Sequence, residues 1–266
     1  MSLAPYRVRA FNTAKASENK IHDDATAQKF GFKSGFVGGV CVYGYMSHQP
    51  LQRWGRDWLE RGTGEAKFGK PVYDNEIAEV VAVEDAEGME LTVQSLGIDC
   101  ATGRAALPAN LPPVPALSDY KSVPVRADRL DPDEQTLPIG GWLGMNPLTI
   151  TDAFLAQDIE DTRETNPIYA KEKIINPGTV LRCCNWVLSH NVILPAWIHM
   201  GSKVRNLGLA RVGDTLNARA RITKNYEHKG HKWVEVDCLV VANETSPVIQ
   251  AIHIAIYRPR QLAEAA

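Results

Sequence analysis

A histidine and an asparagine near the N-terminus have a spacing that can support proton transfer. Residues 17–22 read Ser-Glu-Asn-Lys-Ile-His, which places Asn19 three residues before His22. An imidazole changes charge near neutral pH, so His22 is a candidate acid-base residue. We expect Asn19 to orient the loop or the reacting water, and Glu18 is the neighbouring carboxylate.

A glycine pair comes directly before an apolar segment and predicts the start of a helix. The pair is Gly38-Gly39, and the apolar segment begins at Val40. The first N–H groups of a helix have no intrahelical partner and lie at the positive end of its dipole. We therefore expect the N–H of Gly39 to contact negative charge that develops on a substrate oxygen.

The motif has an altered copy in the second half of the chain. Residues 164–169 read Glu-Thr-Asn-Pro-Ile-Tyr, and Asn166 follows Asn19 by 147 positions. An Asn-Pro-Gly segment that ends at Gly178 then precedes a second apolar segment. A repeat of half the chain predicts two similar domains side by side.

Each half carries an apolar helix followed by strands that contain alternating or β-branched residues. The helices are expected from Val40 through Leu59 and over residues 180–198. The expected strands are 77–83 and 90–96 in the first half, and 216–222, 232–241 and 248–257 in the second. The sequence thus predicts an α+β fold in which a curled antiparallel sheet wraps a long central helix in each repeat.

A proline-rich segment separates the two halves. Seven prolines between Leu107 and Pro138 prevent a regular helix and predict a linker that crosses the surface. We place the N-terminal repeat at residues 1–110, the linker at 111–140 and the C-terminal repeat at 141–266. Joining the two repeats edge to edge would cover sheet edges that either would expose alone.

Composition limits the partners of the chain. The 266 residues are 44% hydrophobic and 23% charged, so a folded chain is expected rather than a disordered one. The net charge of −2 provides no field that would attract a polyanion, so no nucleic-acid partner is expected. Five cysteines without a C-x-x-C pair suit a reducing compartment. No apolar run approaches the ~20 residues that span a bilayer, and the N-terminus does not read as a signal peptide. We expect a cytoplasmic protein with no membrane partner.

Metal and nucleotide sites find little support in the sequence. His228 and His231 lie three residues apart, but no cysteine or carboxylate follows at ligand spacing, so no metal is expected. The glycines before Val40 lack the strand-loop-helix context of a phosphate-binding loop. No nucleotide cofactor is expected either.

The motifs resemble the MaoC-like, (R)-specific enoyl-CoA hydratases, which have the hotdog fold, here in a double-hotdog form. The mark of that family is Asp-x-Asn-Pro-(Leu/Ile)-His, followed by Gly-Phe-x-x-Pro-Ile-x-His-Gly at the start of the central helix. The first repeat keeps Asn19, His22 and Gly39, and Ser47 falls where the family often has a serine on this helix. The resemblance implies a lyase whose substrate is an acyl thioester of CoA or acyl carrier protein, with no further cofactor, and leaves a homodimer open.

The departures from the family motif concern the acid-base pair. Ser17 occupies the position of the catalytic aspartate, and Tyr169 occupies the position of the histidine in the second repeat. The carboxylate that restores the pair is then Glu18, Asp23, Asp24 or Glu164. Ser17, Ser47 and Gly39 are expected to contact the substrate, with Glu164, Asn166, Tyr169 and Gly178 as their second-repeat counterparts.

Three activities remain open for such a site. Adding water to an α,β-unsaturated thioester needs a base for the water, an acid for the α-carbon and donors for the thioester oxygen. Hydrolysis of the thioester needs one carboxylate to activate water, and Glu18 or Glu164 would serve. Two incomplete motifs also suit a protein that binds acyl-CoA without catalysis.

Overall fold

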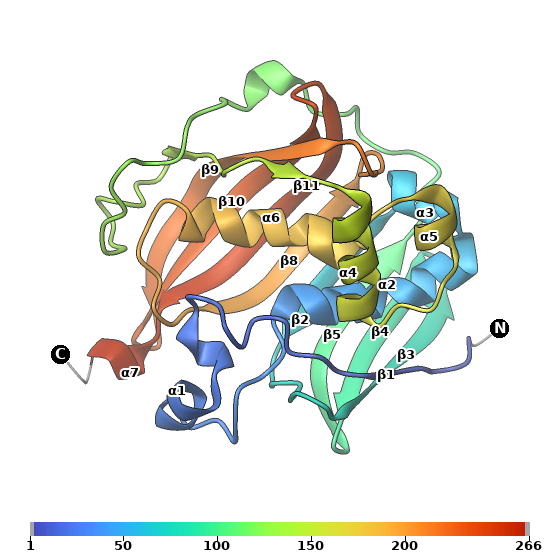
Figure 1. Cartoon of the computed structure of the whole chain (residues 1–266), viewed down its shortest axis with the longest axis horizontal. Helices are drawn as coiled ribbons and strands as arrows, with labels where there is room; N and C mark the ends of the chain where they lie inside the picture. Colours follow the sequence, from blue (N-terminus) through green and yellow to red (C-terminus); the bar gives the residue numbers. More distant parts are fainter. Residues whose placement is uncertain (1–2, 264–266) are drawn as a thin grey trace.

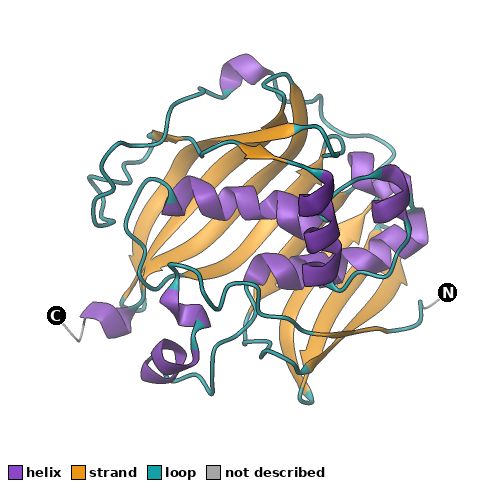
Figure 2. Ribbon diagram, in the orientation of Figure 1, coloured by secondary structure: helices purple, strands orange, loops and turns teal. Residues whose placement is uncertain are grey.

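The computed structural model describes residues 3–263 and contains one eleven-stranded antiparallel sheet curved around two central helices (Figure 1; Figure 2). The strands are ordered β1-β3-β4-β5-β2-β8-β11-β10-β9-β6, and β7 pairs with β9. The first half supplies β1 to β5 and the helix α2, and the second half supplies β6 to β11 and the helix α6. The expected α+β architecture, a helix wrapped by a curled sheet in each half, is confirmed.

The elements of the first half are β1 (Tyr6–Arg9), η1 (Lys20–His22), α1 (Asp24–Lys29), α2 (Gly39–Trp54), α3 (Arg56–Arg61), β2 (Thr63–Phe68), β3 (Ile77–Asp85), β4 (Gly88–Ser95) and β5 (Ile98–Ala106). Those of the second half are η2 (Leu117–Asp119), β6 (Trp142–Leu143), β7 (Leu148–Thr149), α4 (Asp152–Thr162), α5 (Ile168–Glu172), α6 (Pro177–Ser189), β8 (Ile198–Asn206), β9 (Thr215–His228), β10 (His231–Ala242), β11 (Ser246–Arg258) and α7 (Arg260–Ala263). Apart from η2, residues 107–141 form no helix or strand, as their prolines predict.

Both predicted helices are longer than the observed ones. The first helical segment is broken at Gly55, which adopts φ 60° and separates α2 from α3. The second ends at Ser189, and Ile198 already begins β8. The side chain of Asn191 donates to the carbonyl of Val187 at 2.9 Å and so helps to end α6. The intervening residues form a loop.

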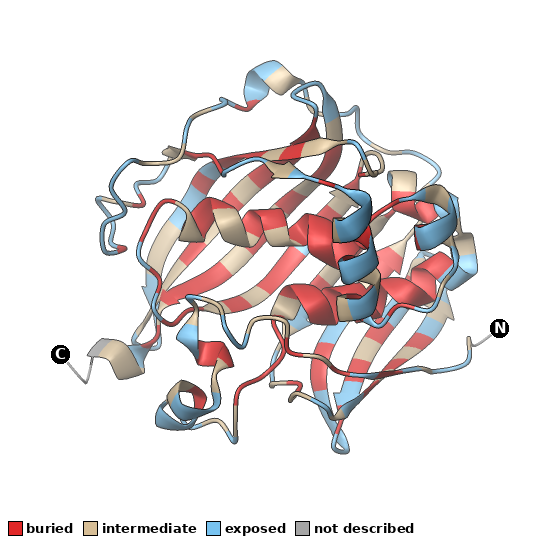
Figure 3. Cartoon of the chain, viewed as in Figure 1, coloured by how far each residue is buried: buried red, intermediate tan, exposed pale blue. Residues whose placement is uncertain are grey.

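The two halves are joined by backbone hydrogen bonds and by helix packing. Strands β2 and β8 pair antiparallel, with Gly64 opposite Val204 and Ala66 opposite Ser202. On the concave side of this sheet, α2 packs against α6 (Figure 1). Every residue of α2 from Val40 to Leu51 is buried (Figure 3). The molecule therefore has one continuous core rather than two separate ones.

Two glycines permit the close approach of the central helices. A Cβ at Gly178 on α6 would lie 2.9 Å from the Cα of Gly44 on α2 and would collide with the carbonyl oxygen of Val40. A Cβ at Gly44 would lie 2.8 Å from the side-chain oxygen of Asn176, which caps α6. No larger residue fits at this crossing without moving a helix.

We expect Gly178→Ala to lower the free energy of unfolding by about 1–3 kcal/mol, because the added methyl group meets backbone on the opposite helix. In an exposed helix the same change would raise the free energy of unfolding by about 1 kcal/mol. The sign of the measured change therefore distinguishes a close helix contact from an exposed position. Urea denaturation measures the effect. Gly69→Ala is the control, because its Cβ would meet its nearest atom at 3.8 Å. Equal stabilities of the two variants would contradict the interpretation.

Candidate functional site

His22 is held in one orientation and one tautomer. It ends η1, its exposed fraction is 9%, and its Nδ1 lies 2.8 Å from the carbonyl oxygen of Phe36. A carbonyl oxygen only accepts, so the neutral ring carries its proton on Nδ1 and leaves a lone pair on Nε2. Asn12 Nδ2 donates to the carbonyl of His22 at 2.8 Å and fixes the backbone as well.

The charge of His22 follows from its burial. Burial lowers the pKa of this imidazole from its ordinary value of 6.5, and the hydrogen bond to Phe36 opposes the shift only in part. The ring is therefore neutral at pH 7. Among residues 3–263, no hydrogen-bond partner is seen for Nε2, so this atom is available as a base.

A cavity of about 350 Å³ lies between the repeats beside His22. The first repeat contributes the loop before η1 and the start of α2, and the second contributes α6 and the loop that follows it. Its lining includes Ser17, Glu18, Asn19, His22, Gly38, Val40, Cys41, Arg129, Arg182, Asn185, Trp186, Ser189, His190, Leu194 and Trp197. Four of the predicted first-repeat residues, Ser17, Glu18, Asn19 and His22, are thus brought together.

A second histidine, which sequence analysis did not select, lines the same cavity with the opposite tautomer. His190 Nδ1 accepts the backbone N–H of Asn146 at 3.1 Å, so the neutral ring carries its proton on Nε2. Its ring stacks on Trp186 with a centroid separation of 6.1 Å. Burial, then the charge of Arg129, lowers the pKa of His190. The cavity therefore offers one imidazole acceptor and one imidazole donor.

Glu18 does not pair with His22. Its side chain is 75% exposed and lies 2.7 Å from Arg129, whose hydrogen bond and charge lower the pKa of the carboxyl group. Arg129 also donates to the carbonyl of Ser189 at 2.9 Å. This ion pair connects the first repeat to the linker segment at the edge of the cavity.

The other candidate carboxylates of the first repeat accept hydrogen bonds from backbone N–H groups. Asp23 caps α1 by accepting the N–H of Thr26 at 2.9 Å, and Asp24 accepts the N–H of Gly35 at 3.0 Å. Among residues 3–263, no carboxylate forms a hydrogen bond with His22. Of the four alternatives for the missing carboxylate, Asp23 and Asp24 are therefore not hydrogen-bonded to His22.

Asn19 connects the two repeats. Its Nδ2 donates to the carbonyl of Trp197 at 3.0 Å, and its Oδ1 accepts the N–H of Trp197 at 3.1 Å. Its side chain thus orients the loop rather than a water molecule. Ser17 lines the cavity, and its hydroxyl lies 3.4 Å from the carbonyl oxygen of Asn19.

Gly38, rather than Gly39, borders the cavity beside His22. A Cβ at Gly38 would lie 3.8 Å from Cε1 of His22, whereas a Cβ at Gly39 would meet Phe68 and His199. Gly39 instead lines a separate, mostly apolar cavity of about 220 Å³. Ser47 is 1% exposed and donates to the carbonyl of Tyr43 at 2.8 Å within α2, so it does not face the cavity.

The second-repeat counterparts form a closed network instead of a cavity. Oε1 of Glu164 lies 2.8 Å from His48 Nδ1 and accepts the backbone N–H groups of Thr165 and Asn166. The ring of Tyr6 stacks on His48 at 3.7 Å. Tyr169 is 1% exposed and packs in the core, and Gly178 lies at the helix crossing. Glu164 therefore pairs with His48 of the other repeat, not with His22.

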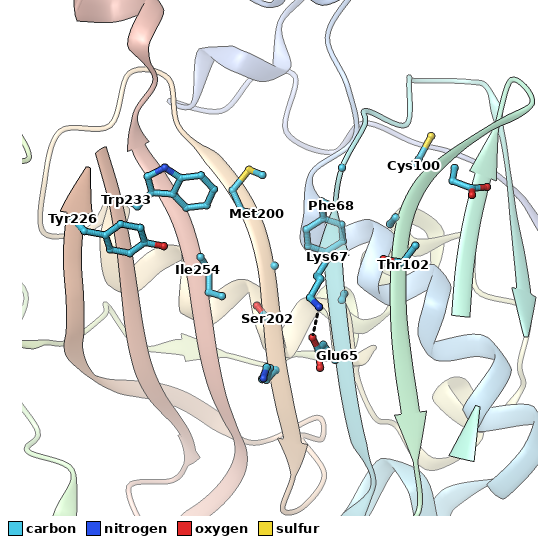
Figure 4. A pocket seen from close by; sticks show the side chains of 16 residues that line it. Glu65, Lys67, Phe68, Cys100, Thr102, Met200, Ser202, Tyr226, Trp233 and Ile254 are labelled. Carbon is cyan, nitrogen blue, oxygen red and sulfur yellow. Dashed lines mark ion pairs between the residues drawn. The ribbon is translucent and has the colours of Figure 1, made fainter. Parts of the chain in front are cut away.

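Figure 4 shows a third, more open hollow over the sheet from β5 to β9, with a volume of about 430 Å³. Lys67 and Glu65 of β2 form an ion pair of 3.1 Å there, and Trp233 of β10 and Tyr226 of β9 line its other side. This hollow contains none of the residues selected from the sequence.

Within residues 3–263, no group of three or more His, Cys, Asp or Glu side chains is arranged to hold a metal ion. In the same described range, no helix has the length and apolar composition to cross a bilayer.

Comparisons with known proteins establish the fold. No family model matches the sequence, and no curated protein matches it. A structure described as a MaoC domain dehydratase from Chloroflexus aurantiacus superimposes with a TM-score of 0.62 at 12% identity, covering 97% of this chain and 94% of that one. A conserved hypothetical protein from Mycobacterium tuberculosis, described as a double hotdog, gives a TM-score of 0.60 at 12% identity over 96% of each chain.

A third similar structure carries a different description. It is described as an oleoyl thioesterase from Lactobacillus plantarum, and it gives a TM-score of 0.53 at 12% identity over 96% of each chain. The chain therefore has the double hotdog fold. Proteins of this fold are described with more than one activity, so the fold does not select the reaction.

We expect Glu164→Ala to lower the free energy of unfolding by about 2–4 kcal/mol, because it leaves His48 and two backbone N–H groups without their acceptor in a buried site. Urea denaturation measures this, with the exposed Glu160→Ala on α4 as control, for which a change within about 0.5 kcal/mol is expected. A small effect at Glu164 would show that the closed network contributes little to stability.

Proposed function

We propose that this double hotdog protein hydrates, or in reverse dehydrates, an acyl thioester. The observation that carries the proposal is neutral His22, whose Nε2 has no hydrogen-bond partner among residues 3–263 and which lines a cavity built by both repeats. The cavity volume of about 350 Å³ suits a short acyl group and its thioester. The acyl group would arrive on CoA or on acyl carrier protein. The proposed reaction uses only side chains and backbone groups of the protein, with no further cofactor.

His22 would transfer the proton in both steps of the reaction. Its Nε2 takes a proton from water while the water oxygen bonds to the β-carbon of the enoyl thioester. The electron pair of the double bond moves onto the thioester, whose oxygen gains the charge of an enolate. The imidazolium then returns the proton to the α-carbon, so that H and OH have been added and the base is restored.

Donors for the enolate oxygen are present in the same cavity. His190 lines the cavity and offers its Nε2–H, and the backbone N–H of Val40, in the first turn of α2, is a second candidate because Val40 also lines the cavity. Such donors stabilise charge most strongly where water is excluded. The apolar side chains of Val40, Leu194 and Trp197 line the cavity and supply that exclusion.

The first test is an assay with crotonyl-CoA, whose ultraviolet absorbance falls when the double bond is hydrated. We expect His22→Ala to reduce the rate by about 10²–10⁴-fold, the usual contribution of a general base. The exposed His228→Ala is the control and should retain the wild-type rate. Release of free thiol by the wild-type protein would instead indicate a thioesterase, and affinity without either reaction would indicate a binding protein.

The second test is the pH dependence of kcat/KM. The base must be neutral, and burial lowers the pKa of His22 below 6.5, so activity should be constant near pH 7 and decline only at pH values below 6.5. Rates with crotonyl-CoA between pH 5 and 8 measure the profile. A loss of activity that begins above pH 7 as the solution is acidified would contradict a lowered pKa at the base.

A further inference from the structure

One face of α6 carries the polar residues of the cavity. Arg182, Asn185, Trp186, Ser189 and His190 recur at helical spacing and all border it. The proposed reaction uses His190 from this set, and Arg129 holds the carbonyl of Ser189. Arg182 has no role in that chemistry.

Arg182 lacks a carboxylate partner. Its Nη2 lies 3.7 Å from Cys41 Sγ, and no other hydrogen bond and no ion pair within 4 Å is seen for this side chain in the described part of the chain. Arg129, in the same cavity, is bound by Glu18 at 2.7 Å. A partly buried guanidinium is costly unless a charged group or several acceptors satisfy its donors.

The charges around the cavity leave an excess of one cation. Arg129, Arg182 and Glu18 are its charged lining residues, and Glu18 pairs with Arg129. His22 and His190 are neutral, since burial lowers the pKa of each. Arg182 is therefore the uncompensated charge on the lining.

The charge of Arg182 acts on the pKa of the Asp158 carboxyl group, but the oxygens of Asp158 already accept other hydrogen bonds. They accept the backbone N–H of Asn176 and the hydroxyl of Thr179. Burial raises the pKa of Asp158, and the field of Arg182 opposes this shift from beyond ion-pair distance. Asp158 thus supports the start of α6 and leaves the donors of Arg182 open.

We propose that Arg182 binds a carboxylate at the end of a short acyl chain, so that the substrate is the half-thioester of an unsaturated dicarboxylic acid. This substrate class rests on the proposed function for its thioester. An arginine suits the ligand because its planar fork matches a carboxylate.

The position of Arg182 selects the acyl chain over the phosphates of CoA. Its contact, Cys41, is three residues beyond Gly38, which borders His22, so the guanidinium lies near the reacting centre. Arg129 marks the rim, where its side chain is 37% exposed. A cavity of about 350 Å³ is at the small end of ligand sites and leaves the nucleotide of CoA outside.

The test compares two saturated thioesters of equal chain length, glutaryl-CoA and pentanoyl-CoA, by isothermal titration calorimetry. We expect the wild-type protein to bind glutaryl-CoA about 10- to 100-fold more tightly, the range for a charge-assisted hydrogen bond. Arg182→Gln should abolish this preference and leave pentanoyl-CoA affinity within about twofold. The exposed Arg221→Gln should retain the preference.

Two further arms separate the alternatives. The same acyl pair on N-acetylcysteamine carries no phosphate, so a preference that persists there supports the acyl carboxylate. Equal weakening of both CoA esters by Arg182→Gln would assign the contact to the phosphates and overturn the proposal. Absence of any wild-type preference would also overturn it, and that comparison does not depend on how the variant folds.

Turnover is measured separately with 2-pentenoyl-CoA, so that the two proposals can fail independently. Hydration of this ester without a preference for glutaryl-CoA would reject the substrate class and keep the hydratase. A preference for glutaryl-CoA, with hydration of neither 2-pentenoyl-CoA nor its dicarboxylic counterpart glutaconyl-CoA, would support the role of Arg182 and reject the reaction.

Discussion

The close contact of α2 with α6 is the constraint on which the rest of the structure depends. Gly44 and Gly178 let the helix backbones meet, and the pairing of β2 with β8 fixes the sheet behind them. Because the helix contact and the strand pairing hold the repeats together, the start of α2 and the polar face of α6 both line one cavity. The site is therefore a property of the joined repeats, and neither half contains it alone.

The corresponding positions of the two repeats differ in state. In the second repeat, Glu164 reaches His48 on the helix of the first, and Tyr6 covers the pair. In the first repeat, Ser17 stands at the position that corresponds to Glu164, and Ser17 and His190 both line the open cavity. A glutamate at one position accompanies a packed, buried network, and a serine at the other accompanies a cavity.

Local patterns in the sequence predicted the fold class and the neighbourhood of His22, because repeat spacing and helix starts depend on nearby residues. The partners of His22 were not predictable in this way. Its Nδ1 bonds to the carbonyl of Phe36, and a backbone acceptor has no signature in residue types. His190 and Arg182 were missed because they come from the opposite repeat; helical spacing along α6 was the signal that could have grouped them. The loop after Ser189 was read as helix because its residues are apolar.

The uncharged carbonyl acceptor beside His22 has an electrostatic consequence. A carboxylate would raise the pKa of the imidazole and add negative charge to the cavity, whereas a carbonyl holds the same Nδ1–H without charge. His22 is consequently a weaker base, and its lowered pKa keeps the ring in the neutral form at pH 7. An anionic acyl chain would be repelled by an Asp–His pair, and it meets no such charge here. The uncharged acceptor beside His22 and Arg182, which has no ion-pair partner among residues 3–263, together leave the cavity lining with a net positive charge, and this charge is the electrostatic basis of the proposed acidic substrate.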